Sequence, residues 1–502
     1  MSKFNQSVKG KTKTVNHEGA PAYKLGAEME LYALAVTTML SNKFYEGSAD
    51  TLKRLQALIP QVKPEFVAKL AVYAREKMYL RSLPLVLVTE LAKIHNGDDL
   101  VSRVTKRVVA RADEITELLS LYGQANGSKN VKKLGKLSKQ IQKGLSDAFN
   151  KFDEYAFAKY NRDGAVKLRD ALFVVHPKAK STDQQALFDK IAADTLETPD
   201  TWEVELSAST DKKSSWERLI LEDKLGYMAL LRNLRNIMDA QVSNEAVAVL
   251  CQKLSSPEEV AKSKQFPFRF FSAYREIEGN NSTNASLILG ALEDAIQASA
   301  NNIAGFDENT TVLISSDVSG SMQSPVSERS KVQMYDIGLV LSMLLQNRSK
   351  KVISSIFGTT FAIKNFPKTN ILSNMSRMRD LAREVGMSTN GHLILKHLLD
   401  TKTVVDKVMV FTDCQLYDST AGAWGGQRDA QNNMKTLWKQ YKEIAPNAKM
   451  YLFDLNGYGT TPLSIASNDV FLIAGWSDRV FDMLEAYEKG SNAVAEIDQI
   501  TI

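Results

Sequence analysis

The sequence predicts a helical domain followed by an α/β domain, and three observations carry this prediction. Apolar residues recur at helical spacing through roughly the first 300 residues, and strand-like segments alternate with helix-like segments after that point. In addition, an aspartate follows two of the apolar strands. We therefore expect a polar N-terminal segment at 1–27, a helical domain at 28–303 and an α/β domain at 304–502.

The helical half carries apolar stripes separated by short connections. Four residues recur at positions i, i+4, i+7 and i+8 and so share one helix face: Phe66, Leu70, Tyr73 and Ala74. Residues 83–91 are nearly all apolar and are expected to be buried on every side. Successive amphipathic helices of this kind predict stacked antiparallel pairs, as in an α-solenoid.

Strand and helix patterns alternate in the C-terminal part. The predicted strands are 310–316, 351–357, 407–412, 449–454 and 470–473, and the predicted helices are 331–346, 375–384, 430–443 and 478–488. This alternation predicts a parallel sheet that helices cover on both faces. In such sheets, ligands bind outside the carboxyl ends of the strands.

The composition is that of an ordinary globular protein, with 44% hydrophobic and 24% charged residues. The net charge of +5 permits nucleic-acid binding without demonstrating it. The two cysteines lie far apart, so neither a disulfide framework nor a Cys/His zinc site is expected. Residues 1–19 hold no apolar leader, and no apolar run could span a membrane. We therefore expect a cytoplasmic protein.

Oxygen ligands gather at the ends of two predicted strands. One strand is followed by Asp317, Ser319 and Ser321, and another by Asp413. Because the carboxyl ends of parallel strands lie at one edge of a sheet, the two aspartates are expected to converge. Carboxylates with hydroxyls suit a hard cation such as Mg²⁺. Hydroxyls bring little charge, so such a site leaves a position for an acid from a partner.

Two rows of basic residues make this chain a candidate for RNA binding, because phosphate neutralisation supplies much of RNA affinity. One row has the spacing i, i+4, i+8, and its members are Arg103, Arg107 and Arg111. The other lies in a stretch without acids, and its members are Lys132, Lys136, Lys139 and Lys143. Basic rows are more often solvated helix faces, so this alternative stays open.

Several motifs resemble those of a known family. Residues 317–322, 386–391 and 408–413 resemble the first, second and third loops of the metal-ion-dependent adhesion site of von Willebrand factor A domains, although Met387-Ser388 replaces the usual glycine pair. The helical half resembles the TROVE module at residues 69–75, 80–85, 160–164, 198–203, 227–236 and 267–270. This order of modules resembles the Ro autoantigen family, including its bacterial members.

The resemblance implies a closed ring of HEAT-like helical repeats joined to a doubly wound, Rossmann-like A domain. It implies that Ser319, Ser321 and Thr389 contact the metal directly, while Asp317 and Asp413 hold it through waters.

The resemblance also implies partners for the ring. Small structured Y RNAs would bind its outer surface, and the single-stranded 3′ ends of misfolded RNAs would enter its hole. The family has basic RNA contacts and a histidine in a segment that matches Lys159, Arg162 and His176. In bacterial members, polynucleotide phosphorylase is a further partner.

Three functional hypotheses follow. The first is a monomeric, non-catalytic RNA-binding scaffold in noncoding RNA quality control, with no DNA partner. The second is an Mg²⁺-dependent phosphoryl hydrolase, although such sites usually hold more carboxylates than Asp317 and Asp413. The third is an adaptor whose metal site binds an acidic protein partner. Cys414 has no histidine near it in the sequence and is expected to be an inert thiol, so no catalytic residue is assigned.

Overall fold

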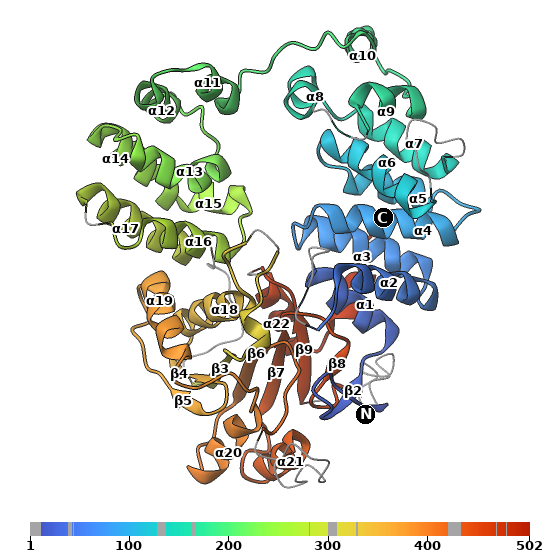
Figure 1. The fold of residues 1–502 in the computed structure, drawn as a ribbon. Coiled ribbons are helices and arrows are strands. Elements are labelled where there is room, and N and C mark those ends of the chain that lie inside the picture. Colours follow the sequence, from blue (N-terminus) through green and yellow to red (C-terminus); the bar gives the residue numbers. More distant parts are fainter. Residues whose placement is uncertain are drawn as a thin grey trace. The chain divides into compact units, whose positions relative to one another are not determined.

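The computed structural model describes residues 12–38, 43, 45–127, 137–161, 164, 166–280, 282–299, 309–327, 330–419, 433–467, 469–477 and 479–502 (Figure 1). The chain divides into two compact units. One unit comprises Met1–Thr51 and Thr210–Ala493, and the other comprises Leu52–Ser209 and Val494–Ile502. Within the described part of the chain, no helix is both long and apolar enough to cross a membrane.

The unit built from Leu52–Ser209 and Val494–Ile502 is helical. Its helices are α2 (Ser48–Leu58), α3 (Pro64–Glu76), α4 (Ser82–Ile94), α5 (Leu100–Val108), α6 (Asp113–Ala125), α7 (Lys139–Phe149), α8 (Glu154–Tyr160), α9 (Leu168–Val175), α10 (Thr182–Ala193), α11 (Trp202–Ala208) and α23 (Ala493–Asp498), with a short 3₁₀ turn at Ile59–Gln61. Helix α3 packs on α4 and α5, α4 on α6, α5 on α7, and α9 on α6 and α7. Each helix thus buries its apolar stripe against near neighbours in sequence, as an α-solenoid does.

The close packing of α5 on α7 depends on a glycine. A Cβ atom at Gly144 would lie 2.5 Å from the Cβ of Thr105 and 2.6 Å from the carbonyl oxygen of Ser102. Both neighbours belong to α5, and Thr105 is fully buried. The two helices therefore approach each other more closely than a side chain at residue 144 would permit.

Gly144→Ala is expected to lower the free energy of unfolding by about 1–3 kcal/mol, because the added methyl group overpacks the contact between α5 and α7. Urea unfolding followed by circular dichroism measures this loss. Gly226→Ala is the matched control, since nothing lies within 4 Å of a Cβ at that position. An equal effect of the two substitutions would contradict the packing argument.

The other unit combines helices with a sheet. Its helices before the sheet are α1 (Ala27–Val36), α12 (Lys212–Leu221), α13 (Tyr227–Asp239), α14 (Asn244–Ser255), α15 (Pro257–Ser263), α16 (Pro267–Ile277) and α17 (Thr283–Ala298). Helix α16 packs on α13, α17, α18 (Met334–Arg348) and α19 (Ile371–Ala382), and α17 also packs on α14 and α19. The helices from α12 to α17 therefore belong to the same compact unit as the sheet.

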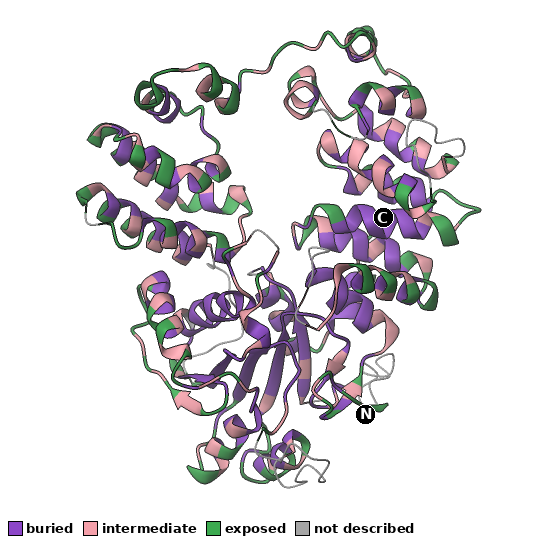
Figure 2. Ribbon diagram, viewed as in Figure 1, coloured by how far each residue is buried: buried purple, intermediate pink, exposed green. Residues whose placement is uncertain are grey.

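The six-stranded sheet has the order β5-β4-β3-β6-β7-β9, and all neighbouring strands are parallel except β5 and β4. The strands are β3 (Thr311–Asp317), β4 (Lys351–Phe357), β5 (Phe361–Ile363), β6 (Lys407–Thr412), β7 (Lys449–Asp454) and β9 (Val470–Ala474). The associated helices are α18 (Met334–Arg348), α19 (Ile371–Ala382), α20 (His392–Asp400), α21 (Met434–Ile444) and α22 (Val480–Glu488). Figure 2 shows that most of this sheet is buried.

After β3, the chain first adds strands on one side of β3 and then on the other side. It proceeds from β3 outward to β4 and then returns to β6 on the opposite side of β3. In open α/β sheets, this reversal opens a crevice at the carboxyl ends of the two central strands. Asp317 and Asp413 lie at these two strand ends, so the convergence predicted for them has the expected topological basis.

Most predicted strands occur at or within one residue of their expected bounds, and β4, β6 and β7 coincide with them. Other elements differ. Helix α19 begins four residues before the predicted start at residue 375, and α20 was not predicted. The polar N-terminal segment contains β1 (Lys13–Val15) and β2 (Pro21–Lys24), and β2 pairs with β8 (Thr460–Thr461). Such short strands lack a hydrophobic period of their own, so their sequences carry no signal for them.

Candidate metal centre and candidate nucleic-acid interface

Asp317 is fixed at the carboxyl end of β3 by hydrogen bonds to both of its carboxylate oxygens. The backbone amide of Ser319 donates to Oδ1 at 3.0 Å, and the Thr412 hydroxyl donates to Oδ2 at 2.7 Å. Thr412 is the last residue of the neighbouring strand β6. The parallel pairing of β3 with β6 therefore orients this carboxylate toward the crevice between the strands.

Asp413 lies at the end of the adjacent strand and keeps one oxygen without a partner. The amide of Gln415 donates to its Oδ1 at 2.9 Å. Its Oδ2 is buried and has no hydrogen-bond partner among the described residues. Buried carboxylate oxygens are normally satisfied, so this atom fits a position that faces a cation.

Hydroxyl groups complete the donor set. The hydroxyls of Ser319 and Ser321 lie 3.4 Å apart, and both residues are buried. The predicted second loop lies against the first, because the Gly320 amide donates to the Met387 carbonyl at 2.8 Å. Thr389, two residues further along, is also buried. The carboxylates and the two serine hydroxyls are oxygen donors of the kind that Mg²⁺ prefers, and Thr389 would add a third hydroxyl.

Burial raises the pKa of both acids, and the repulsion between them adds to the effect at Asp413. Burial raises the pKa of Asp317 to about 6. Burial, followed by the negative charge of Asp317, raises the pKa of Asp413 to about 8. A cation bound here would therefore displace a proton. The same desolvation raises the pKa of the buried Cys414 thiol, so its thiolate is disfavoured as a nucleophile.

A basic hollow lies between α7 and the chain that follows α9; we call it the α7–α9 pocket. Its volume is about 420 Å³, and its basic lining residues are Lys139, Lys143, His176, Lys178 and Lys180. Of these, Lys139, Lys143 and His176 are sequence-predicted RNA contacts that come from separate motifs. Lys180 was not predicted from the sequence, because it belongs neither to the lysine row at 132–143 nor to the segment with Lys159 and His176. Among the described lining residues, Asp147 is the only acid.

Hydrogen bonds from side-chain amides of α7 and the residue that follows it to backbone carbonyls hold the two sides of this pocket together. The Gln142 side-chain amide donates to the carbonyls of Val174 and Val175 at 3.3 Å and 3.2 Å. The Asn150 side-chain amide donates to the Lys178 carbonyl at 3.1 Å. His176 ends α9 in the left-handed conformation, with φ 51° and ψ 58°. This turn brings the lysines after α9 to the pocket, while Lys139 and Lys143 stay exposed one helical turn apart.

The arginine row predicted at residues 103–111 does not lie on one helix, because α5 ends at Val108 and Arg111 follows it. Each of its arginines has an acidic partner within the same unit. Arg103 pairs with Asp99 at 2.9 Å and donates to the main-chain oxygen of Ile502 at 2.8 Å. Arg107 donates to both carboxylate oxygens of Glu76 at 2.6 Å and 2.9 Å, and it also contacts the Thr501 carbonyl.

The third member, Arg111, pairs with Asp113 at 3.1 Å and lies 4.4 Å from the centre of the Tyr160 ring. Each of the three arginines therefore has an acidic partner within its unit, while their side chains stay 32–48% exposed.

The remaining predicted RNA contacts are Lys159, Arg162, Lys132 and Lys136, and none of them is among the described lining residues of the α7–α9 pocket. Lys159 is half-buried and lies over the rings of Tyr155 and Tyr160, at 5.6 Å and 5.9 Å from their centres. Arg162, Lys132 and Lys136 lie outside the described residues.

The chain resembles known proteins in sequence and in fold. The TROVE domain matches residues 32–197 and 193–302. Telomerase protein component 1 from Mus musculus is 24% identical over 333 residues, which cover 50% of this chain and 13% of that protein. The same protein from Rattus norvegicus is 23% identical over 333 residues, with the same coverage. This chain thus matches only about an eighth of the length of these relatives.

The crystal structure of the Deinococcus radiodurans RO (RSR) protein has a similar fold. It superimposes with a TM-score of 0.58 at 16% sequence identity, and the match covers 93% of this chain and all of that chain. Since the TROVE matches together span more than half of the 502 residues, this chain belongs to the TROVE domain family.

Proposed function

We propose that this chain is a non-catalytic RNA-binding scaffold that holds small structured RNA at the α7–α9 pocket. Membership of the TROVE family implies a ribonucleoprotein component that binds RNA. The proposal rests mainly on one observation. Five basic side chains line the α7–α9 pocket, and only one of its described lining residues is an acid. Lysines so placed neutralise the phosphates of an RNA backbone.

The finer proposal rests on the resemblance to Ro proteins. The RNA would be a Y RNA on the outside of a helical ring, and the ends of misfolded RNAs would enter the hole of the ring. The chain would act as a cytoplasmic monomer of the bacterial type in noncoding RNA quality control, joined to polynucleotide phosphorylase. Sequencing the RNA that co-purifies with the protein tests this assignment, and recovery of DNA or of no nucleic acid would contradict it.

The strand ends of β3 and β6 support a second function, the binding of a divalent cation. Ser319, Ser321 and Thr389 would hold Mg²⁺ directly, and Asp317 and Asp413 would hold it through waters, as in a von Willebrand factor A domain. The buried, unpartnered Oδ2 of Asp413 favours this proposal. The cation would supply an open position for an acidic group of a protein partner, which makes the chain an adaptor as well.

A phosphoryl hydrolase is the less favoured use of this cation. Among the described residues, no group of three or more His, Cys, Asp or Glu side chains is placed to hold a metal. Hydrolytic sites with two metals need more carboxylates than this one offers.

Lys139→Gln combined with Lys143→Gln is expected to weaken binding of a small folded RNA about tenfold, because two lysine ammonium groups no longer neutralise phosphates. The slope of log affinity against log salt should become shallower by about 1.4 to 1.8, which is the contribution of two such groups. Electrophoretic mobility shifts at several salt concentrations measure both quantities.

Arg103→Gln is the matched control for this double variant. Its guanidinium already pairs with Asp99 and the main-chain oxygen of Ile502, so its removal should change RNA affinity less than twofold. If Arg103→Gln weakens binding as strongly as the double lysine variant does, the α7–α9 pocket is not the RNA surface.

A further inference from the structure

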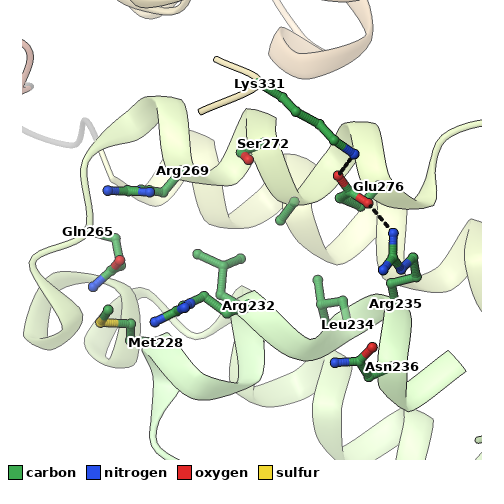
Figure 3. A pocket seen from close by; sticks show the side chains of 12 residues that line it. Met228, Arg232, Leu234, Arg235, Asn236, Gln265, Arg269, Ser272, Glu276 and Lys331 are labelled. Atoms are coloured by element: carbon green, nitrogen blue, oxygen red, sulfur yellow. Dashed lines mark hydrogen bonds and ion pairs between the residues drawn. The ribbon is translucent and has the colours of Figure 1, made fainter. Parts of the chain in front are cut away.

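A second basic hollow lies between α13 and α16, in the unit that holds the sheet; we call it the α13–α16 pocket. It has a volume of about 570 Å³. Its charged lining residues are Arg232, Arg235, Arg269, Glu276 and Lys331, so four cations face one acid among the described residues. Figure 3 shows the two helices on opposite sides of the cavity, with these side chains reaching into it or along its rim.

The charges divide into two groups at the two ends of the pocket. Glu276 pairs with Lys331 at 2.9 Å and with Arg235 at 3.0 Å. These ion pairs also lower the pKa of Glu276, with Lys331 as the largest cause, so Glu276 stays ionised and paired at this end of the pocket. The dashed lines in Figure 3 mark both contacts.

Arg232 and Arg269 form the other group and have no carboxylate partner among the described residues. Both side chains are solvent-accessible, and both point toward the end of the pocket near Gln265 (Figure 3). Desolvation by the surrounding protein, followed by the positive charge of Arg232, lowers the pKa of Arg269. Two guanidinium groups that repel each other in a partly enclosed space are stabilised when an anion binds between them.

From this geometry we propose that the α13–α16 pocket is a second RNA-binding site, in which Arg232 and Arg269 hold one backbone phosphate of an RNA strand. This inference rests on the proposed RNA-binding function and extends it to a site on the other compact unit. Planar guanidinium groups bind phosphate through paired N–H donors, and two of them surround a single phosphate more completely than lysines do.

The rest of the lining suits the nucleotide that carries this phosphate. The side-chain amide of Gln265 lies beside the arginines. Its Nε2 donates to the Ser263 carbonyl at 3.1 Å, which leaves its second N–H and its carbonyl oxygen for a sugar or base. Met228 is 49% exposed at the same end and provides an apolar, polarisable surface for a base. The volume lies within the range of pockets that enclose small organic ligands, so there is room for a nucleotide.

The test uses the full chain with Arg232→Gln and Arg269→Gln combined, and a fluorescein-labelled single-stranded RNA of about 12 nucleotides as the probe, a length within the site sizes of single-strand binders. We expect the affinity measured by fluorescence anisotropy to fall about tenfold. The slope of log affinity against log salt should become shallower by about 0.7 for each phosphate that is no longer neutralised, as is typical of single strands. Unchanged affinity and slope would overturn the proposal.

Two further variants keep the result interpretable. Arg218→Gln on α12 is the matched control in the same unit, because Arg218 pairs with Glu222 at 4.0 Å and is not among the described lining residues of either pocket, so the affinity should stay within twofold. Arg232→Lys combined with Arg269→Lys keeps both charges but removes the paired donors, so it should retain the salt slope and bind more weakly. This second variant tests the proposal even if the glutamine variant unfolds, and full retention of affinity would overturn the role of the guanidinium groups.

Competition separates an RNA strand from a free phosphate compound. Unlabelled RNA should displace the probe at far lower concentration than adenosine monophosphate or inorganic phosphate does. Equal competition by the monophosphate would overturn the RNA strand as the occupant.

The lysine variant of the α7–α9 pocket, measured in parallel, distinguishes the two sites. If that variant binds folded RNA normally while the arginine variant no longer binds the short single strand, the proposed function of the α7–α9 pocket fails and the present inference stands.

Discussion

Asp317→Ala is expected to reduce Mg²⁺ affinity about 10- to 100-fold, the usual effect of removing a group that orients a metal's ligands. In the structure, Asp317 accepts hydrogen bonds from the Ser319 amide and the Thr412 hydroxyl, so it holds two neighbours of the proposed site. RNA affinity should stay nearly unchanged, because the basic pockets are built from other residues. Isothermal titration calorimetry with Mg²⁺ measures the first effect and mobility shifts measure the second.

Asp413→Asn provides a second variant for the same site. It is nearly isosteric, and it neutralises the carboxylate whose Oδ2 has no hydrogen-bond partner among the described residues. We expect it to remove Mg²⁺ binding while it preserves or increases the stability of the metal-free protein, because it removes the cost of burying a carboxylate and its repulsion with Asp317.

Asp482→Ala, which changes an exposed carboxylate on α22, should leave both Mg²⁺ binding and RNA binding intact. If Asp317→Ala abolishes RNA binding in a protein that remains folded, the assignment of RNA and metal to separate sites is wrong.

Arg75→Met is expected to lower the free energy of unfolding by about 3–5 kcal/mol, because it leaves a buried carboxylate without its main cationic partner. The Glu114 side chain has an exposed fraction of 0%, and Arg75 pairs with it at 2.7 Å. The amides of Ala110 and Arg111 also donate to Glu114, at 2.8 Å and 3.0 Å. The pair thus ties α3 to the start of α6. Urea unfolding at neutral pH measures the loss.

Two companions test the cause of this loss. Arg75→Met combined with Glu114→Gln removes both charges and should recover much of the lost stability. Arg81→Met removes an arginine whose side chain is 44% exposed and which pairs with Asp113 at 2.9 Å, so it should cost about 1 kcal/mol or less. Equal losses for Arg75→Met and Arg81→Met would mean that burial does not control the energetics of this cluster.

The position of Arg75 also bears on function. The sequence alone leaves open whether Arg75 and Arg81 point into the hole of the predicted ring. In the structure, Arg75 faces Glu114, and Arg81 lies near Glu114, Asp113 and Glu117, at 3.5, 2.9 and 3.6 Å. The TROVE-like segment that contains them therefore serves the stability of the helical unit.

Local periodicity in the sequence was enough to specify the helical body, the parallel sheet and the strand ends that carry Asp317 and Asp413. An apolar run of five or six residues, such as 407–412, specifies a buried strand wherever its neighbours lie. Strand direction then places the following residue at the carboxyl edge of the sheet, so Asp317 and Asp413 could be placed at one edge before any coordinates, whereas Thr389 came from the family resemblance.

Long-range packing, in contrast, settles which basic residues are available to a ligand. The regular spacing of Arg103, Arg107 and Arg111 predicts an exposed row, yet Asp99, Glu76, Asp113 and the main chain of residues 501–502 engage it. Conversely, Lys180 and Arg269 belong to no basic row, but packing places each in a hollow where acids are few among the described residues. Periodicity reports which face of a helix a residue occupies. It does not report which charges from distant parts of the chain meet that face, and those charges decide whether a phosphate can bind there.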